Sequence, residues 1–107
     1  MTTFEKRKDG FENKFAHDAE LQFKAEARRN KLVGLWAAGL LGKTGADADA
    51  YAKAVIAADF EKAGDSDVFA KIRRDFDAAG VQQSDHQIRR TMDEMMQTAM
   101  TQIAGEI

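Results

Sequence analysis

The side chains that could perform nucleophilic or acid–base chemistry are few and widely separated in this chain. The chain has 107 residues, no cysteine, and two histidines, His17 and His86, that lie far apart in the sequence. The two serines, Ser66 and Ser84, each precede an apolar helical pattern, which is where helix-capping residues are found. No nucleophile is paired with a base in the way that a catalytic triad requires. We therefore expect no catalytic residue and no enzymatic activity.

A metal site is the next chemistry to consider, because His17, Asp18 and Glu20 lie close together in the sequence. Neighbouring residues on a helix do not share a face, and the chain has no pair of histidines four residues apart. We therefore predict no metal site. His17 still titrates near neutral pH, so it is either a pH switch or an interface histidine without a switching role.

Two further segments resemble binding motifs only superficially. The segment GLLGKTG, residues 39–45, lacks the full phosphate-loop spacing and a preceding strand, so we interpret it as a turn between helices. The basic run at residues 26–31 has no interleaved aromatic residues, and the net charge of the chain is −2. Nucleic acid is therefore not an expected partner. Arg28, Arg29 and Lys31 in this run are interpreted as a solvated face or as a patch that docks on another protein.

Four helical patterns must position these side chains. The chain has no proline, and most of its glycines stand where helical patterns end. The first pattern begins at about residue 11 or later and ends at Leu41. The second begins near Asp47, after a possible Thr44 cap, and ends before Gly64. The third is capped by Ser66 or Asp67 and ends before Gly80, and the fourth follows a Ser84–Gln87 capping box. No segment alternates like a strand, so we predict an all-α, four-helix bundle.

The apolar residues at helical spacing predict the core. In the first pattern a dense apolar end is expected to anchor the core, with Trp36 as its largest contributor. Gly34 and Gly39 are expected to permit a close helix crossing. The residues expected to face inward are Leu32, Leu35, Trp36, Leu40, Leu41, Ala52, Val55, Ile56, Phe60, Ala63, Val68, Phe69, Ile72, Phe76, Ala79, Ile88, Met92, Met95, Met96, Ala99, Met100 and Ile103, with Tyr51 at the edge.

Charge and hydropathy bear on location and assembly. No apolar run reaches the roughly 20 residues that span a bilayer, and the first ten residues lack the apolar stretch of a secretory signal. We expect a cytoplasmic protein without direct membrane insertion. Residues 21–43 carry five basic residues and one acidic, whereas residues 44–67 carry six acidic residues and two basic. These segments either attract each other inside one fold or form separate binding surfaces.

The first residues of the chain carry an aromatic stripe. At 100° per residue, Phe4, Phe11 and Phe15 fall within about 40° of one another on a helix, whereas Phe23 and Leu35 point away from them. The stripe therefore does not continue into the core face of the first helix. It packs against the end of the bundle, or it is a set of anchors for a groove on another protein, and composition alone leaves both alternatives open.

Several long segments resemble a known family. The run FENKFAHDAELQFKAEARRNKLVGLWAAGLLG at residues 11–42, with YAKAVIAADFEKAG, DVFAKIRRDF and HQIRR further on, is similar to the zeta subunit that inhibits bacterial F1FO-ATP synthase. The resemblance covers nearly the whole chain. It implies a mobile N-terminal arm that inserts as a helix at a catalytic α/β interface of F1, beside the γ rotor, and blocks rotation in the hydrolysis direction.

The resemblance assigns residues 1–19 to this inhibitory arm, partly disordered alone, and residues 20–107 to a four-helix globular domain. It favours the partner interpretation of the aromatic stripe. The chain departs from the family pattern at Gly10 and in its basic opening KRKDG, which raise the cost of forming an inhibitory helix. The arm residues expected to contact F1 are Phe4, Phe11, Glu12, Lys14, Phe15 and His17.

Partners and cofactors follow from the same resemblance. It implies the α, β and γ subunits of F1 as partners and a location at the membrane-extrinsic F1 sector, and it implies no cofactor beyond a weak binding of ATP or ADP. Two alternatives remain at this stage: a helical adaptor of a protein complex without inhibitory action, and a weak nucleotide-sensing module.

Overall fold

The computed structural model describes residues 18–61 and 66–106. Within these ranges the chain forms four helices and no strand: α2 (Ala19–Leu40), α3 (Gly45–Glu61), α4 (Ser66–Ala79) and α5 (Asp85–Glu106). The predicted all-α, four-helix fold is confirmed. Helix α2 ends within one residue of the predicted Leu41, and α3 begins two residues before the predicted Asp47. Helix α4 begins at Ser66, so Ser66 and Asp67 both lie in its first turn and neither precedes it as the predicted cap. The predicted end before Gly64 lies outside the described residues.

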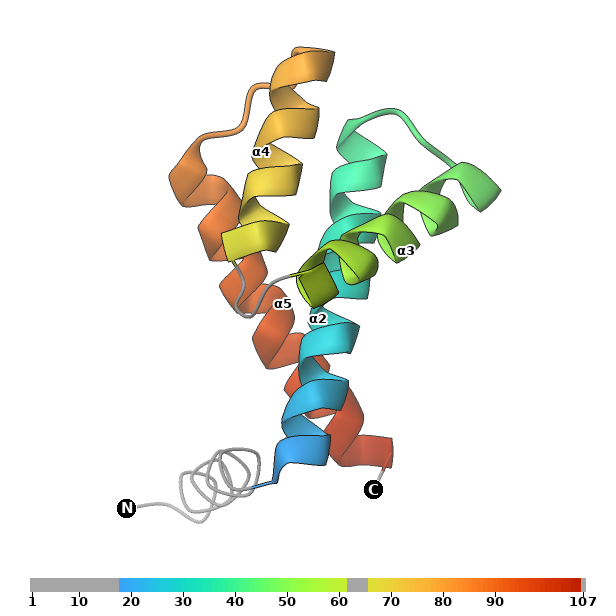
Figure 1. The fold of residues 1–107 in the computed structure, drawn as a ribbon, viewed down its shortest axis with the longest axis vertical. Helices are drawn as coiled ribbons and strands as arrows, with labels where there is room; N and C mark the ends of the chain where they lie inside the picture. The colour runs from blue at the N-terminus through green and yellow to red at the C-terminus, as the bar shows by residue number, and fades with distance from the viewer. Residues whose placement is uncertain (1–17, 62–65, 107) are drawn as a thin grey trace.

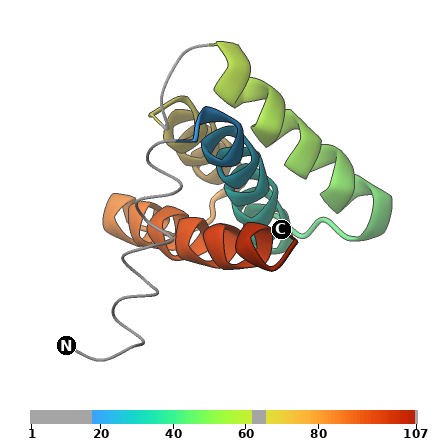
Figure 2. The same ribbon diagram turned by 90° about the horizontal axis from the view of Figure 1, so that it is seen from below.

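Helix α2 is the central element of the fold. It packs against α3 on one side and against α5 on the other, and α4 packs against both α3 and α5. Figure 1 shows that α2 and α5 run in opposite directions and extend together below the level of α3 and α4. The view from below in Figure 2 shows α3 and α5 on opposite sides of α2.

The main core joins all four helices, and eight of its side chains are completely buried: Val33, Ala37, Ala38, Val55, Val68, Ile72, Phe76 and Ile88. The predicted inward faces of α4 and α5 are largely confirmed, but Ala79 is exposed. Tyr51, predicted at the edge, is buried. The side chains of Phe60 and Ala63 lie outside the described residues.

The predicted inward face of α2 was partly wrong. Its fully buried residues are Val33, Ala37 and Ala38, whereas Leu40 is 40% exposed. Leu32, Leu35, Trp36 and Leu41 are only partly buried. Trp36 still packs on the core, where its ring meets Phe76 edge to face at a centroid distance of 5.6 Å. Small residues thus take the buried positions at this end of α2, and at Gly34 helix α3 lies too close for any larger side chain.

Gly34 makes this close crossing possible. A Cβ atom on Gly34 would lie 2.7 Å from the Cα atom of Ala52 on α3, which is shorter than any ordinary contact. The prediction of a close crossing is confirmed at this glycine. It is wrong for Gly39, where a Cβ atom would meet nothing within 4 Å.

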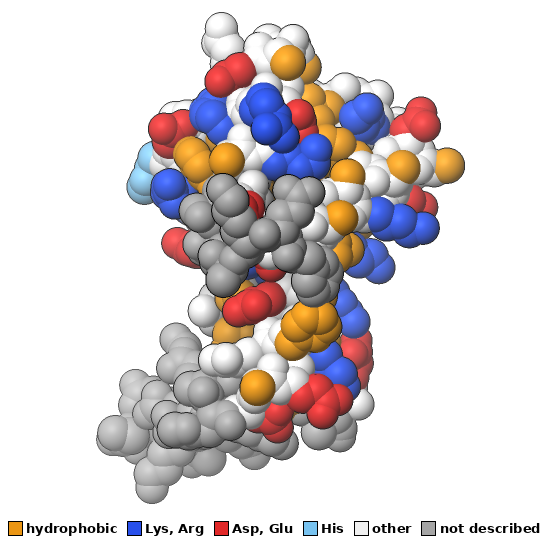
Figure 3. All heavy atoms as spheres, in the orientation of Figure 1, with side chains coloured by type: hydrophobic (Ala, Val, Ile, Leu, Met, Phe, Trp, Pro, Cys, Tyr) orange, Lys and Arg blue, Asp and Glu red, His pale blue; other side chains and the backbone are white. Residues whose placement is uncertain are grey.

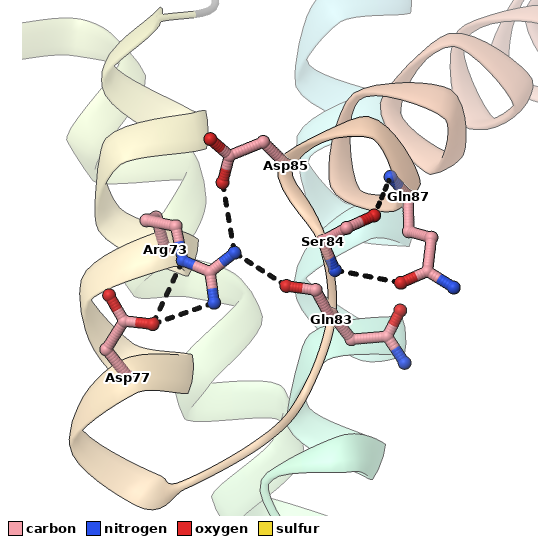
Figure 4. Close-up of polar contacts among 6 residues, drawn as sticks. All are labelled: Arg73, Asp77, Gln83, Ser84, Asp85 and Gln87. Carbon is pink, nitrogen blue, oxygen red and sulfur yellow. Dashed lines mark hydrogen bonds and ion pairs between the residues drawn. The ribbon is translucent and has the colours of Figure 1, made fainter.

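The short connection between α4 and α5 is held by hydrogen bonds from side chains at its two ends. Ser84 and Gln87 form the predicted capping box, in which each backbone N–H donates to the other residue's side chain, at 2.8 and 3.1 Å. The Arg73 guanidinium spans the connection, donating to Asp77, to Asp85 and to the backbone carbonyl of Gln83 (Figure 4). Gly80, with φ of 71°, supplies the left-handed residue that ends α4.

Candidate functional site

The arm residues predicted to contact F1 lie outside the part of the chain that the structure describes. The structure therefore describes the chain from Asp18 onward, at the end of the predicted arm, and the surface beside it. The six residues concerned are Phe4, Phe11, Glu12, Lys14, Phe15 and His17.

The base of the arm is marked by the N-cap of α2. The carboxylate of Asp18 accepts hydrogen bonds from the backbone N–H groups of Glu20 and Leu21, at 3.0 and 3.1 Å. Asp18 itself has extended backbone angles, φ −114° and ψ 102°. An aspartate in this position satisfies donors that the first helical turn leaves unpaired, and its charge suits the helix dipole. Residue 18 is thus a defined helix start. This cap was not predicted from the sequence, although an aspartate directly before an apolar helical pattern is a recognised signal of a helix start.

Beside this cap, the first turns of α2 and the last turns of α5 form a two-helix stem. We define the stem as residues 19–28 and 96–106. Its own small apolar cluster consists of Leu21, Ala25 and Ile103, and three partly buried residues pack against it: Met96, Met100 and Ala104. The start of α2, which Asp18 caps, therefore lies at the end of the stem away from α3 and α4 (Figure 1).

The proposed docking residues lie in three different environments. Arg28 donates to Gln102 and to Glu106 of α5, both at 2.8 Å, so it closes the stem. Arg29 is only 6% exposed, and its Nε donates to the side-chain oxygen of Asn30. Of the three, Lys31 is the one that is exposed to solvent.

The oppositely charged segments predicted from the sequence lie on α2 and α3, which pack against each other. One polar contact between these two helices runs from the side-chain amide of Asn30 to the carboxylate of Asp59, at 2.9 Å. The ion pair of Arg28 goes to α5 instead. On the face of the molecule that Figure 3 shows, Lys and Arg side chains are interspersed with Asp and Glu side chains.

A polar cluster between α3 and α4 was missed in the sequence. The Tyr51 hydroxyl donates to the Asp75 carboxylate at 2.8 Å, and Lys71 forms an ion pair with the same oxygen at 3.0 Å. Burial raises the pKa of Tyr51, and the hydrogen bond to Asp75 adds to this. Burial alone would raise the pKa of Asp75, but the hydrogen bonds from Tyr51 and Lys71 outweigh it and hold that pKa below its usual value. The cluster is a link between two helices.

The segment at residues 39–45 is a helix–helix turn, as predicted. Gly42 has a φ of 77°, and the N–H of Lys43 donates to the carbonyl oxygen of Ala38 at 2.9 Å. This is the pattern by which a glycine ends a helix. The N–H of Lys43 is thus engaged in capping α2.

The other chemistry considered finds no support within the described ranges. Across residues 18–61 and 66–106, no three His, Cys, Asp or Glu side chains gather as metal ligands would. Over the same residues, no helix is long and apolar enough to cross a membrane. The described fold is thus a small helical protein whose polar clusters link its own helices.

Comparison with known proteins identifies the class as that of a regulatory subunit. The family model of the ATPase inhibitor subunit zeta matches residues 1–102, nearly the whole chain. The chain belongs to this family. The role that membership assigns is inhibition of an ATPase, which is regulatory rather than catalytic, and F1-ATPase is the partner that it implies.

A solved structure shares the fold. A protein studied by solution NMR is 46% identical in sequence, with a TM-score of 0.71, and the match covers 81% of this chain and 99% of that one. No curated protein shows significant similarity to the chain.

Proposed function

We propose that this protein inhibits ATP hydrolysis by the F1 sector of F1FO-ATP synthase through residues 1–19. These residues form a helix on F1 and insert at a catalytic α/β interface beside the γ subunit. There they block rotation in the hydrolysis direction. The observation that carries the proposal is that the family match begins at residue 1 and thus includes the whole arm.

The aromatic stripe supplies the apolar anchors of this helix. Phe4, Phe11 and Phe15 share one face of a helix, and anchors at such spacing are typical of a helix that binds in a groove. Glu12, Lys14 and His17 supply polar contacts at its sides. The cap at Asp18 supports the separation of an arm from a globular part, because it gives the globular part a helix start of its own. The arm joins the globular part at residues 18–19.

The remaining described residues position the arm. Lys31 on the exposed side of α2 is a docking contact. Arg28 acts by holding α2 against α5, and Arg29 acts by donating to Asn30, which in turn donates to Asp59 on α3. The protein acts in the cytoplasm at the membrane-extrinsic F1 sector, without a cofactor of its own.

The test is ATP hydrolysis by F1 that has been depleted of this protein and then titrated with the full chain or with a chain lacking residues 1–17. This truncation keeps Asp18 and therefore keeps the cap of α2. The expected result is inhibition by the full chain only, with the helical circular dichroism of α2–α5 retained in the truncated chain. Equal inhibition by both chains would contradict the proposal.

A non-inhibitory adaptor predicts a different result. In that case the full chain binds F1, measured by co-sedimentation, but hydrolysis is unchanged. Titration with ATP or ADP, followed by NMR shifts of Lys43 and its neighbours, separates a nucleotide-sensing module from both.

A further inference from the structure

The apolar interior of the protein is divided into two clusters of unequal size. We call the described part outside the stem, where all four helices pack, the head. It contains ten buried residues in one cluster. The stem, residues 19–28 and 96–106, contains three buried residues in another cluster, and Ala99 is fully buried outside both clusters, so its four buried apolar residues all come from α2 and α5. Figure 1 shows the two helices of the stem continuing past α3 and α4. Among the residues that the structure describes, the packing of the stem is therefore that of α2 against α5.

A buried polar layer separates the two clusters along α2. Arg29 is 6% exposed and Asn30 is 1% exposed, between Ala25 of the stem cluster and Val33 of the head cluster. Asn30 donates to Asp59 on α3, so this layer is fixed to the head. Buried polar groups keep their hydrogen bonds because losing them in the interior is costly. Separation of the helices on the stem side of this layer leaves the Asn30–Asp59 hydrogen bond intact.

The contacts that close the stem are weak ones. The Arg28–Glu106 ion pair spans 2.8 Å, but 55% of the Glu106 side chain and 28% of the Arg28 side chain are exposed to solvent. Solvent screens pairs of this kind. Helical segments as short as the ten residues of α2 in the stem are marginal without tertiary packing. Regions with few buried apolar contacts open at lower free energy than the rest of a protein.

We infer that the stem opens as a unit while the head stays folded, and that this opening frees residues 19–28 to rearrange together with the arm on F1. The second half of the inference rests on the proposed function. Ten helical residues add about 15 Å to the length that the arm reaches from the head. Opening also exposes Leu21 and Ala25, which continue as apolar contacts for the partner.

Hydrogen exchange of the free, full-length chain tests the first half without F1. Backbone amides at residues 23–28 and 100–104 are compared with those at residues 33–38 and 72–76. The expected result is protection at least about tenfold lower in the stem. Amides across the stem are also expected to share one denaturant slope, smaller than that of the head, because opening of the stem exposes less surface than global unfolding. Equal protection in stem and head, with the same denaturant dependence, would show a single cooperative unit and overturn the inference.

Substitution of Arg28 sharpens this test. Arg28→Ala is expected to raise stem exchange by roughly twofold to fivefold and to leave head exchange unchanged. Arg90→Ala is the matched control, because Arg90 forms an exposed ion pair with Glu94 within α5 only. A rise of equal size in stem and head with Arg28→Ala would also overturn the inference.

The complex with F1 tests the second half. The expected result is that residues 23–28 become more protected while residues 100–104 lose protection, because α2 has exchanged one partner for another. Unchanged protection of both segments in an inhibited complex would overturn this half alone. If F1 is not inhibited although the free chain shows the stem–head difference, the proposed function fails and the division of the fold stands.

Discussion

The crossing of α2 and α3 allows a prediction whose sign can be worked out from the structure. Alanine at position 34 would place a Cβ atom 2.7 Å from the Cα atom of Ala52 and 3.2 Å from its Cβ atom. The closest neighbour is backbone, which cannot rotate away. Overpacking of this kind costs about 1–3 kcal/mol, and a rigid neighbour favours the upper end of that range.

Helix propensity opposes this cost. Replacing glycine by alanine inside a helix stabilises the helix by about 1 kcal/mol. The net expectation for Gly34→Ala is a loss of about 2 kcal/mol in the free energy of unfolding. For a domain of this size, that loss corresponds to a Tm lowered by roughly 10 °C.

Gly39→Ala is the matched control, because Gly39 lies in the same helix and has open space around it. Its expected effect is stabilisation by up to about 1 kcal/mol. Urea titration followed by circular dichroism measures both variants in one assay. If Gly34→Ala proved as stable as the original chain, the close crossing inferred from Gly34 and Ala52 would be refuted.

Three further predictions concern other contacts. The chain has a single tyrosine, so ultraviolet titration reports the ionisation of Tyr51 alone. The pKa of Tyr51 is raised in the fold, so its hydroxyl stabilises the protein fully below about pH 10, and this contribution is lost as pH rises further. Tyr51→Phe should therefore make the loss of stability at alkaline pH less steep. The pKa of Asp75 is lowered in the fold, so its carboxylate contributes to stability above about pH 4, and this contribution is lost as pH falls. Asp75→Asn should therefore weaken the dependence of stability on acid pH, measured by urea titration at several pH values. An unchanged pH dependence would count against the Tyr51–Asp75–Lys71 link. Ser84→Ala should lower the free energy of unfolding by about 1 kcal/mol through loss of the capping box, whereas Ser84→Asp should largely retain it.

The sequence predicted most of the fold because its local signals are strong. The Ser84–Gln87 capping box and the Gly80 helix end are patterns of a few neighbouring residues, and both are present in the structure. The apolar stripe of α4 also has a clear helical period, and Val68, Ile72 and Phe76 are buried as expected.

The inward face of α2 was harder to predict because α2 contacts helices on two sides. Its leucines suggested the core, but the buried positions are taken by Val33, Ala37 and Ala38. Which face turns inward depends on how closely α3 approaches, and that distance is set by Gly34 against Ala52 on another helix. Hydrophobicity alone does not contain this information.

The polar links were missed for a related reason. Tyr51 and Asp75 are 24 residues apart, and Arg28 and Glu106 are 78 apart. No local pattern pairs them, because their contact is a product of the packed fold. The arm residues, by contrast, were assigned from the family resemblance, and their roles stay predictions.

A titration of ATP hydrolysis by F1 tests the central claim most directly. The full chain is compared with a chain in which Phe4, Phe11 and Phe15 are all replaced by alanine, and Leu40→Ala, at an exposed apolar residue outside the arm and the stem, serves as the control. The account predicts that the triple variant loses inhibition while its α2–α5 helices and its Tm are unchanged. Inhibition by the triple variant at the same concentration as by the original chain would contradict the claim that these aromatic residues anchor the arm on F1.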